Sequence, residues 1–310
     1  MKAIRVHHFG GPEVLVYEDL PQPDPGPNEV LIRVEAAGVG PWDAWIRSGK
    51  SALPQSLPLT LGSDFAGTVV GIGTSVVGLR VGDAVFGVTN PQFTGAYAEF
   101  ALASAAMVAR KPHRLSFVQA AAVPVVAVTA WQMLFDHADV ERGQRILVLG
   151  ASGSVGAIVI QLAHRNGVYT IGATSFDDAE RLRRLGADEL VDIRDAAQLE
   201  KLSAVDAVID VAGGDSQYVG ITKLKRGGVI ISAVSAPDAA MLSQQGATGR
   251  FFLVNTTTRC LEELTPLIEA GELEIRVGTV LPLHRAREAH EMLDGLRPYA
   301  RGKIVLTHSD

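Results

Sequence analysis

The sequence predicts a two-domain α/β protein in which a β-rich domain encloses an inserted, doubly wound domain with a parallel sheet. The chain has 310 residues, about twice the ~150 residues of a typical domain. Short apolar runs separated by glycine and proline fill the first third, whereas strand-like and helical runs alternate from about residue 120. The tail returns to a β pattern. We expect the β-rich domain to span 1–122 and 271–310, and the inserted domain to span 123–270.

The elements of the β-rich domain are predicted from apolar runs with turn residues between them. A proline-rich stretch at 21–27 precedes the run at 30–36, and prolines remove backbone donors, so this stretch is expected to be extended surface. Further runs at 65–73 and 83–87 contain or adjoin glycines, as in a small barrel or sandwich. The run at 303–306 is expected to complete the same domain.

The inserted domain is predicted from continuous apolar runs, which a parallel sheet covered on both faces requires. The predicted strands are 145–149, 168–173, 205–211 and 228–234. Helices are predicted from about 154 to 166, up to about Gly186, and around 259–270.

Composition excludes several functions. Hydrophobic residues make up 47 % of the chain, and 28 Lys and Arg against 34 Asp and Glu leave a net charge of -6, so no nucleic-acid partner is expected. One cysteine, Cys260, forms no intramolecular disulfide and no cysteine-rich zinc site, which favours a cytoplasmic location. The uncharged stretch 117–135 contains Pro124 and several polar residues, so we expect a buried segment and no membrane span.

A glycine-rich loop predicts dinucleotide binding. The sequence GASGSVG at 150–156 follows an apolar strand and opens a helix, as in the A-x-G-x-x-G variant of the fingerprint. Gly153 would let the backbone approach the pyrophosphate and Gly156 would let the helix pack on the strand, while free N–H groups meet the phosphates. The alternative is a purely structural turn. The candidate cofactor residues of the loop are Ser152, Gly153, Ser154, Val155 and Gly156.

The end of the next strand favours NADPH over NADH. An NAD site places a carboxylate there, ~20 residues after the loop, whereas this chain has Thr174 and Ser175, with Asp177 and Asp178 placed to begin a helix. A carboxylate ~4 Å from a 2'-phosphate would cost on the order of 4 kcal/mol per charge pair. Arg181 either contacts the phosphate or faces solvent, and Asp177 keeps NADH possible. Ligands of doubly wound sheets collect at strand carboxyl ends, which adds the backbone of Val211, Ala212, Ala233 and Val234.

Several stretches together resemble the medium-chain dehydrogenase/reductase superfamily. They are GSDFAG at 62–67, GLRVGDAVFG at 78–87, GAYAEF at 95–100, the glycine loop followed by QLA at 161–163, GAD at 186–188 and RGKIVL at 301–306. The zinc-free quinone oxidoreductases, the zeta-crystallin-like branch, are the most similar. The resemblance implies a GroES-like catalytic domain, a Rossmann domain, NADPH and a homodimer joined through the Rossmann domains. It also implies that Thr129 lies near the nicotinamide, the alternative being a hydroxyl bonded within its helix.

The resemblance and the residues both predict a metal-free pocket. Zinc enzymes of this superfamily carry Cys where Gly40 stands and His where Ser63 stands, and the histidines here lack ligand spacing, so we expect no metal and surface histidines. Related quinone reductases often have Asn at the position of Gly40 and Tyr at that of Ser51. The pocket candidates are Gly40, Trp42, Ser51, Ser63 and Asp64, while Asp43 is expected to be structural.

The predicted function is NADPH-dependent, metal-independent hydride transfer to a small electrophilic carbonyl, either a quinone or an α,β-unsaturated aldehyde or ketone. No side chain is identified as a necessary acid; solvent or Ser63 would supply the proton. Two alternatives remain: a 2-enoyl thioester reductase, and a catalytically silent NADPH-binding regulatory protein. The spacing of Tyr299 and Lys303 matches the Tyr-x-x-x-Lys pair of short-chain dehydrogenases, but it lies in the tail strand and is interpreted as coincidence.

Overall fold

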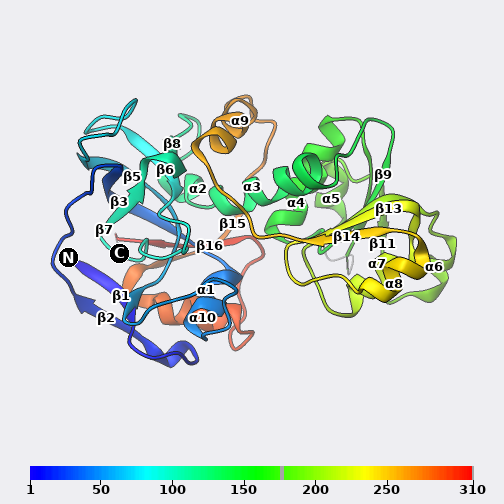
Figure 1. Cartoon of the computed structure of the whole chain (residues 1–310), viewed down its shortest axis with the longest axis horizontal. Coiled ribbons are helices and arrows are strands. Elements are labelled where there is room, and N and C mark those ends of the chain that lie inside the picture. Colours follow the sequence, from blue (N-terminus) through cyan, green and yellow to red (C-terminus); the bar gives the residue numbers. More distant parts are fainter. Residues whose placement is uncertain (175–177, 309–310) are drawn as a thin grey trace. The chain divides into compact units, whose positions relative to one another are not determined.

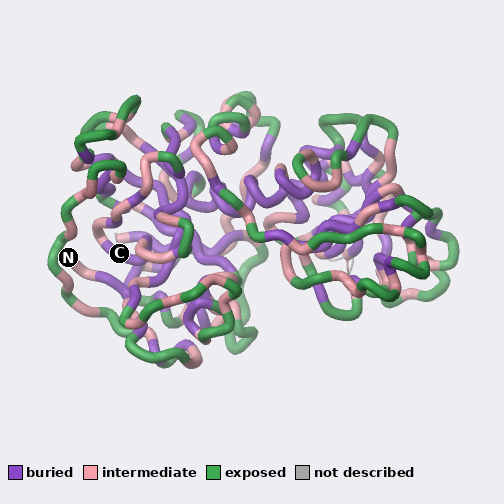
Figure 2. Tube along the Cα trace, in the orientation of Figure 1, coloured by how far each residue is buried: buried purple, intermediate pink, exposed green. Residues whose placement is uncertain are grey.

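The computed structural model describes residues 1–174 and 178–308, and the chain forms two compact units. The β-rich unit comprises 1–125, 256–271 and the described residues from Ile275 onward, and the parallel-sheet unit comprises 126–255 and 272–274. Figure 1 shows the elements of each unit, and Figure 2 shows that buried residues lie mostly along the strands and exposed residues mostly in the loops. Relative to the sequence-based boundaries, 123–125 and 256–270 lie in the β-rich unit, and 272–274 lie in the other.

The β-rich unit contains two sheets whose strand pairs are antiparallel, except for the parallel pair β15–β16. Strand β3 pairs with β16, β5 and β7, so the tail of the chain lies beside a strand formed near its start. The seven-stranded sheet consists of β15 (Val277–Pro282), β16 (Lys303–Thr307), β3 (Glu29–Val39), β5 (Asp64–Ile72), β6 (Ala84–Val88), β8 (Val108–Arg110) and, paired with β3, β7 (Phe100–Ser104). The three-stranded sheet consists of β2 (Leu15–Asp19), β1 (Lys2–Val6) and β4 (Leu59–Thr60).

Two helices of the β-rich unit begin at residues whose side chains satisfy free backbone N–H groups. Ser116 caps α2 by accepting from the N–H of Gln119, and Thr257 caps α9 by accepting from the N–H of Cys260. The described α-helices are α1 (Pro41–Arg47), α2 (Phe117–Ala120), α9 (Thr258–Glu269) and α10 (Ala286–Leu293), and short 3-10 helices span Pro12–Val14, Ala105–Met107 and Leu283–Arg285.

The parallel-sheet unit has the strand order β11-β10-β9-β12-β13-β14, and every neighbouring pair is parallel. The order of the strands reverses between β9 and β12. Doubly wound folds bind their ligands at this point of the sheet. The strands are β9 (Arg145–Leu149), β10 (Tyr169–Ala173), β11 (Glu189–Val191), β12 (Val205–Asp210), β13 (Leu224–Ser232) and β14 (Thr248–Phe251). The helices are α3 (Pro124–Trp131), α4 (Ser154–Arg165), α5 (Ala179–Arg184), α6 (Ala196–Lys201), α7 (Asp215–Thr222) and α8 (Ala239–Gln245), with a π-helix at Gln132–His137.

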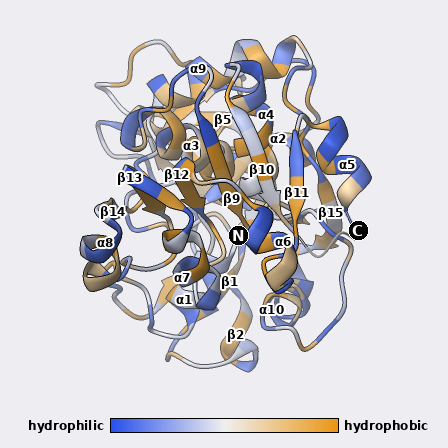
Figure 3. Cartoon of the chain, turned by 90° about the vertical axis from the view of Figure 1, so that its right-hand side faces the viewer, coloured by the Kyte–Doolittle hydropathy of each residue, from blue (hydrophilic) through white to orange (hydrophobic). Residues whose placement is uncertain are grey.

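The apolar runs of the parallel-sheet unit form its buried core, as the sequence predicts. Leu147, Leu149 and Val208 have no exposed surface, and they pack with Ile171 and Ile230 of neighbouring strands. Figure 3 shows the hydrophobic colouring of β9 and β12 in the middle of this sheet. The α/β fold, with a β-rich unit and a doubly wound parallel sheet, is therefore as predicted.

The uncharged stretch 117–135 is divided between α2, α3 and the start of the π-helix. Among the residues described, no helix has the length and apolar character that crossing a membrane requires.

Candidate functional site

The glycine loop connects β9 to α4 and brings backbone N–H groups to the start of that helix. Gly150 adopts a φ of +80°, which favours glycine, and its carbonyl accepts a 3.0 Å hydrogen bond from the N–H of Gly153. A Cβ on Gly156 would lie 2.3 Å from the carbonyl oxygen of Gly150, so this glycine allows α4 to pack on the loop. A Cβ on Gly153 would have that same oxygen as its nearest neighbour at 3.2 Å. Packing within the protein therefore requires Gly156 more strictly than Gly153.

The predicted loop residues lie together at the start of α4. Gly153 is the N-cap of this helix, its φ and ψ are extended, and no side chain caps the first turn. Ser154 and Val155 are the first helical residues. Free N–H groups at a helix start attract phosphate through hydrogen bonding and the helix dipole, so the loop fits a dinucleotide pyrophosphate.

The carboxyl ends of four strands meet at one edge of the parallel sheet. Leu149 of β9 aligns with Ala173 of β10 and Asp210 of β12, and Asp210 aligns with Ser232 of β13. The segments at Val211–Ala212 and Ala233–Val234 follow directly, so the structure brings these predicted backbone contacts to the edge where the glycine loop lies.

Asp210, which the sequence analysis did not identify, holds these segments together. Its Oδ1 accepts from the N–H groups of Ala212 and Gly213 at 3.1 and 2.8 Å. Its Oδ2 accepts from the Ser232 hydroxyl at 2.7 Å and from the Gln217 amide at 2.8 Å. The carboxylate is fully buried and joins the loop after β12 to the end of β13 and to α7. An acidic residue ending an apolar strand was the signal for this role.

Hydroxyl groups lie at the end of β10. The Ser152 and Thr174 hydroxyls form a 2.6 Å hydrogen bond, which holds both side chains together at the carboxyl end of β10. Ser175 and Asp177 lie outside the described residues. Asp178 is the N-cap of α5 without a side-chain capping bond.

Arg181 is held by two carboxylates of the same unit. Its guanidinium forms ion pairs with Asp178 and Glu274, both at 3.1 Å, and Glu274 also pairs with Arg184 at 2.6 Å. Only 14 % of the Arg181 side chain is exposed. This geometry favours a structural role for Arg181 over the phosphate contact that the sequence left open.

Thr129 lies on α3 and is buried, with 5 % of its surface exposed. The segment after it is fixed by Gln132, whose amide donates to the Asn255 carbonyl and accepts from the Asn255 N–H.

In the β-rich unit, four side chains form one cluster. Three of them, Trp42, Ser63 and Asp64, are predicted pocket residues, and the fourth is Lys303. Asp64 and Lys303 make an ion pair of 3.2 Å, with side chains that are 0 and 5 % exposed. The Lys303 ammonium lies 4.1 Å from the ring centroid of Trp42, and the Trp42 indole N–H donates to the Ser63 hydroxyl at 3.0 Å. Asp64 also accepts from the N–H of Val125 at 3.0 Å. Burial raises the pKa of Asp64, and the Lys303 charge opposes this shift.

Asp43 forms a second buried group beside this cluster. Its Oδ2 accepts from the N–H of Gly40 at 2.8 Å and from the Tyr97 hydroxyl at 3.0 Å. Burial raises the pKa of Asp43 to about 7, although the Gly40 hydrogen bond and the Lys303 charge lower it. Burial and the Asp43 charge raise the pKa of Tyr97. The structure thus supports the expected structural role of Asp43, which fixes the start of α1.

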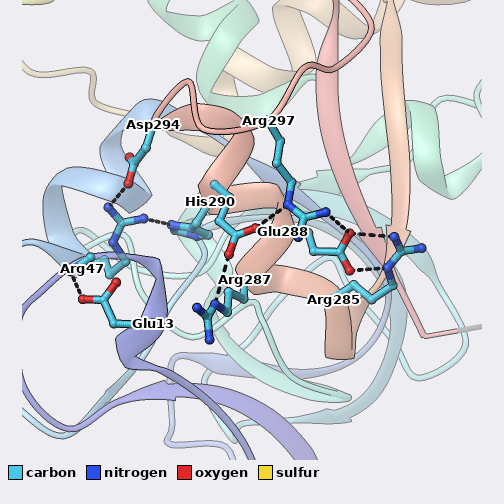
Figure 4. A network of polar contacts seen from close by, with 10 residues as sticks. Glu13, Arg47, Arg285, Arg287, Glu288, His290, Asp294 and Arg297 are labelled. Atoms are coloured by element: carbon cyan, nitrogen blue, oxygen red, sulfur yellow. Dashed lines mark hydrogen bonds and ion pairs between the residues drawn. The ribbon is translucent and has the colours of Figure 1, made fainter.

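A buried histidine corrects the expectation of surface histidines. His290 of α10 has no exposed surface, its ring lies edge-on to that of Tyr97, and its Nδ1 accepts from the Arg47 guanidinium at 3.0 Å. Arg47 also pairs with Asp294 at 2.7 Å, and Figure 4 shows these contacts beside the exposed charge pairs of α10. Burial, and then the Arg47 charge, lower the pKa of His290 to about 3, so the ring is neutral and acts as an acceptor. The ring can be buried because the Arg47 guanidinium donates a hydrogen bond to it.

The remaining pocket candidate does not join the cluster. Ser51 lies in the loop after α1, and its hydroxyl accepts from the Leu53 N–H at 3.1 Å, as in a local serine turn. Residues 1–174 and 178–308 contain no group of three or more His, Cys, Asp or Glu side chains that could hold a metal ion.

Lys303 is the residue of this cluster that sequence reasoning missed. It begins β16, and the pairing of Ile304 with Val39 places it next to the end of β3. A Cβ on Gly38 would lie 2.4 Å from the Ala121 carbonyl oxygen, 2.9 Å from the Asp64 side chain and 3.1 Å from that of Lys303, so this glycine makes room for backbone and for the ion pair. The sequence pattern that could have revealed it is a lysine at the start of an otherwise apolar strand. A lysine buried at such a position requires a partner of opposite charge.

Comparisons with known proteins identify relatives along nearly the whole chain. Residues 26–113 match the alcohol dehydrogenase GroES-like domain, and residues 185–306 match the family described as zinc-binding dehydrogenase. The human quinone oxidoreductase is 32 % identical over 324 aligned positions, which cover 99 % of this chain and 97 % of the relative.

Solved structures of similar proteins have the same fold. The quinone oxidoreductase from Coxiella burnetii is 34 % identical, with a TM-score of 0.91 and 99 % of each chain covered. The Escherichia coli quinone oxidoreductase complexed with NADPH is 29 % identical, with a TM-score of 0.89, and the match covers 99 % of this chain and 100 % of that one.

Proposed function

Because this chain belongs to the zeta-crystallin-like quinone oxidoreductases of the medium-chain dehydrogenase/reductase superfamily, we propose that it transfers hydride from NADPH to a conjugated carbonyl. The acceptor is a quinone or an α,β-unsaturated aldehyde or ketone. The chain is an oxidoreductase, as its relatives indicate. The observation that carries the proposal is the open glycine loop at the start of α4, on the sheet edge where four strands end.

The residues of the loop and strand ends fit the cofactor. We propose that the N–H groups around Gly153, Ser154 and Val155 bind the pyrophosphate, while Gly156 supports α4 from behind. The backbone after Asp210 and Ser232 lies at the same edge and completes the cofactor contacts, with Thr129 as the contact nearest the nicotinamide. The relative from Escherichia coli was solved with NADPH, which supports the choice of cofactor.

The end of β10 supports NADPH over NADH. Thr174 and Ser152 present hydroxyl groups there, and the nearest described carboxylate along the chain, Asp178, is paired with Arg181. We propose that the two hydroxyls bind the 2'-phosphate, while Arg181, paired with Asp178 and Glu274, has a structural role.

The chemistry requires a hydride and a proton. Bound NADPH supplies the hydride. The protein holds the reactants in attack geometry. The acceptor then gains one proton, and solvent is the proposed donor because the Ser63 hydroxyl is fully buried. The proposed mechanism needs no metal ion.

We further propose that the protein is a homodimer joined through its parallel-sheet units. Strand β14 is an edge of that sheet, and its residues Thr248, Gly249 and Arg250 are exposed. An unpaired edge is a surface on which a second copy can add strands. Sedimentation velocity across a range of protein concentrations tests this assembly, and a monomer throughout would refute it.

A parallel consumption assay tests the function. NADPH and NADH oxidation are followed with a quinone, an enone and a 2-enoyl thioester, and binding of both cofactors is measured separately. We expect oxidation of NADPH with the quinone or the enone, and slower oxidation of NADH. Turnover confined to the thioester would identify an enoyl thioester reductase. NADPH binding without turnover of any acceptor would identify a regulatory binding protein.

A further inference from the structure

Every backbone N–H group in the two segments that follow β12 and β13 donates within the protein. In 211–213 and 233–235, four of these groups donate to side-chain oxygens of Asp210 and Ser232 at 2.8–3.2 Å. The other two donate to strand carbonyls at 3.1 Å. The donors to Asp210 are Ala212 and Gly213, those to Ser232 are Val234 and Ser235, and those to the carbonyls of Leu149 and Asp210 are Val211 and Ala233. These N–H groups are therefore not available to a ligand.

Asp210 is the residue that makes this pattern possible. One oxygen of its fully buried carboxylate accepts from two N–H groups, and the other accepts from the Ser232 hydroxyl at 2.7 Å and the Gln217 amide at 2.8 Å. A hydroxyl has one proton and two lone pairs. Because Ser232 gives its proton to Asp210, both of its lone pairs accept from the N–H groups of Val234 and Ser235. One carboxylate thus orients both segments.

The same two segments present carbonyl groups. Within the part of the chain that the structure describes, four of their carbonyls accept no hydrogen bond from the protein, namely those of Val211, Ala212, Ala233 and Val234. Ala212 is exposed, and the other three residues are partly exposed. The segments lie close together, since a Cβ on Gly213 would be 2.7 Å from the Val234 side chain. They therefore form one surface of hydrogen-bond acceptors.

The neighbouring glycine loop has the opposite character. The first N–H groups of α4 have no acceptor within the helix, and Gly153, its N-cap, supplies no side-chain cap. A Cβ on Gly150 would lie 3.1 Å from the Val211 side chain and 3.4 Å from that of Ala212, so the loop borders the segment after β12. N–H donors suit a phosphate, whereas carbonyl oxygens repel it. The sheet edge is therefore divided into an anion-binding part and a part that suits uncharged, hydrogen-bond-donating groups.

We infer that Asp210 is a positioning residue for the nicotinamide half of NADPH. By taking up the N–H groups after β12 and β13, it leaves a carbonyl surface that suits the ribose hydroxyls and the carboxamide N–H groups of that half and disfavours a phosphate. The dinucleotide is thereby bound in one direction, with its pyrophosphate at α4 and its adenosine half toward β10. This inference rests on the proposed function. The competing role is purely structural, in which Asp210 stabilises the sheet without selecting any part of the ligand.

Two ligands of different extent test this role by calorimetric titration. NADPH contains both halves, whereas 2',5'-ADP carries only the adenosine half with two phosphates. In Asp210→Asn the amide nitrogen cannot accept, so one pair of hydrogen bonds is lost. We expect the Kd for NADPH to rise roughly tenfold and the Kd for 2',5'-ADP to change by less than about twofold. Equal changes for the two ligands, or no change for either, would overturn the inference.

The matched control is Asp206→Asn. Asp206 lies at the other end of β12, about 13 Å from Asp210 along the strand. Its carboxylate also supports structure, accepting from the Arg145 N–H at 2.8 Å and from the Lys225 ammonium at 2.7 Å. We expect both Kd values to stay within about twofold of wild type. A selective loss of NADPH affinity in this variant as well would show that any weakening of β12 has that effect, and would overturn the inference.

A second variant, Ser232→Ala, tests the acceptor surface and remains informative if Asp210→Asn does not fold. It frees the N–H groups of Val234 and Ser235. We expect the wild-type protein to bind NADP⁺ at least about tenfold more tightly than its nicotinic acid analogue, in which a carboxylate replaces the carboxamide. In Ser232→Ala this ratio should fall by about threefold or more, because the freed N–H groups can donate to the carboxylate. An unchanged ratio would overturn the inference.

Failure of the inference differs from failure of the proposed function. If neither NADPH nor 2',5'-ADP binds the wild-type protein, the proposed function fails and the inference fails with it. If the wild-type protein binds and oxidises NADPH while Asp210→Asn binds both ligands as wild type does, only the inference fails.

Discussion

At the scale of single residues, the β-rich unit contains ionisable groups whose burial opposes their charge. Asp43 has a pKa of about 7, against an ordinary value of 3.8, and His290 has a pKa of about 3, against 6.5. Between pH 4 and 7 the folded state binds more protons at Asp43 than the unfolded state does, so this residue lowers stability as pH rises. Between pH 3 and 6.5 the unfolded state binds more protons at His290 than the folded state does. This residue therefore raises stability as pH rises.

The first prediction concerns Asp43→Asn. The amide oxygen can accept from Gly40 and Tyr97 as the carboxylate does, but it has no charge to bury. We expect the variant to gain stability relative to wild type as pH rises from 4 to 7, by up to about 1.4 kcal/mol for each unit of the pKa shift, and to keep this gain above pH 7. Urea unfolding at a series of pH values measures the difference.

The control for this prediction is Asp192→Asn. The hydrogen bond from Arg194 lowers the pKa of Asp192 to about 2, so its contribution to stability changes only below about pH 4. The difference between this variant and wild type should be constant from pH 4 to 7. A constant difference for Asp43→Asn as well would show that Asp43 does not carry the pH dependence.

At the scale of elements, the loop between strand β9 and helix α4 assigns packing and ligand binding to different glycines. Two of its glycines are three residues apart, yet a Cβ would be 2.3 Å from backbone oxygen at Gly156 and 3.2 Å from it at Gly153. The first distance forces backbone to move, whereas the second needs only a small adjustment. The loop therefore contains one glycine for the fold and one whose value depends on a ligand.

The second prediction uses this pair. Gly153→Ala should leave the unfolding free energy within about 1 kcal/mol of wild type, because Gly153 lies at an extended N-cap position. It should nevertheless weaken NADPH binding by roughly tenfold or more, since the methyl group would occupy the space of the pyrophosphate. Gly156→Ala should cost about 1–3 kcal/mol of stability. Calorimetric titration and chemical unfolding distinguish the two, and unchanged NADPH affinity in Gly153→Ala would contradict the proposed phosphate contact.

Elements were predictable from the sequence where contacts are local or periodic. The strand at 145–149 is found with the predicted bounds, because a short apolar run that is followed at once by a glycine turn favours a buried strand over a helix. The contacts of Trp42 were not predictable. Lys303 reaches it through the pairing of β16 with β3, which joins the two ends of the chain, and no local pattern encodes that pairing. Buried His290 was missed for the same reason, because its partner Arg47 is remote in sequence.

At the scale of the whole molecule, the β-rich unit is assembled from three stretches of chain, and its last strand supplies both backbone pairing and a buried charge. Strand β16 lies between β15 and β3, and its first residue, Lys303, pairs with Asp64. The strands of the parallel-sheet unit all lie within residues 145–251, and that unit has its own buried core. The two units should therefore respond differently to loss of the tail.

The third prediction is that deletion of residues 303–310 unfolds the β-rich unit and spares the parallel sheet. Without β16, β3 loses a neighbour and Asp64 loses its counter-ion. Hydrogen exchange should show lost protection in β3 and β5 and retained protection in β9 and β12. Uniform protection in both units of the truncated chain would refute it.

A full-length Lys303→Met variant serves as the control, because it removes the charge and keeps the strand. We expect it to lose about 3–5 kcal/mol through the unpaired Asp64 carboxylate, while exchange protection in β3 persists under native conditions.

The position of β16 also determines the order in which a growing polypeptide can mature on the ribosome. Residues 126–255 emerge before the tail is made, so all six parallel strands can associate while synthesis continues. Residues 1–125 emerge earlier still, but their large sheet stays incomplete until β16 has left the exit tunnel. Translation from the amino end usually lets the first domain fold first. In this protein the parallel sheet can finish folding ahead of the β-rich unit, which must wait for β16.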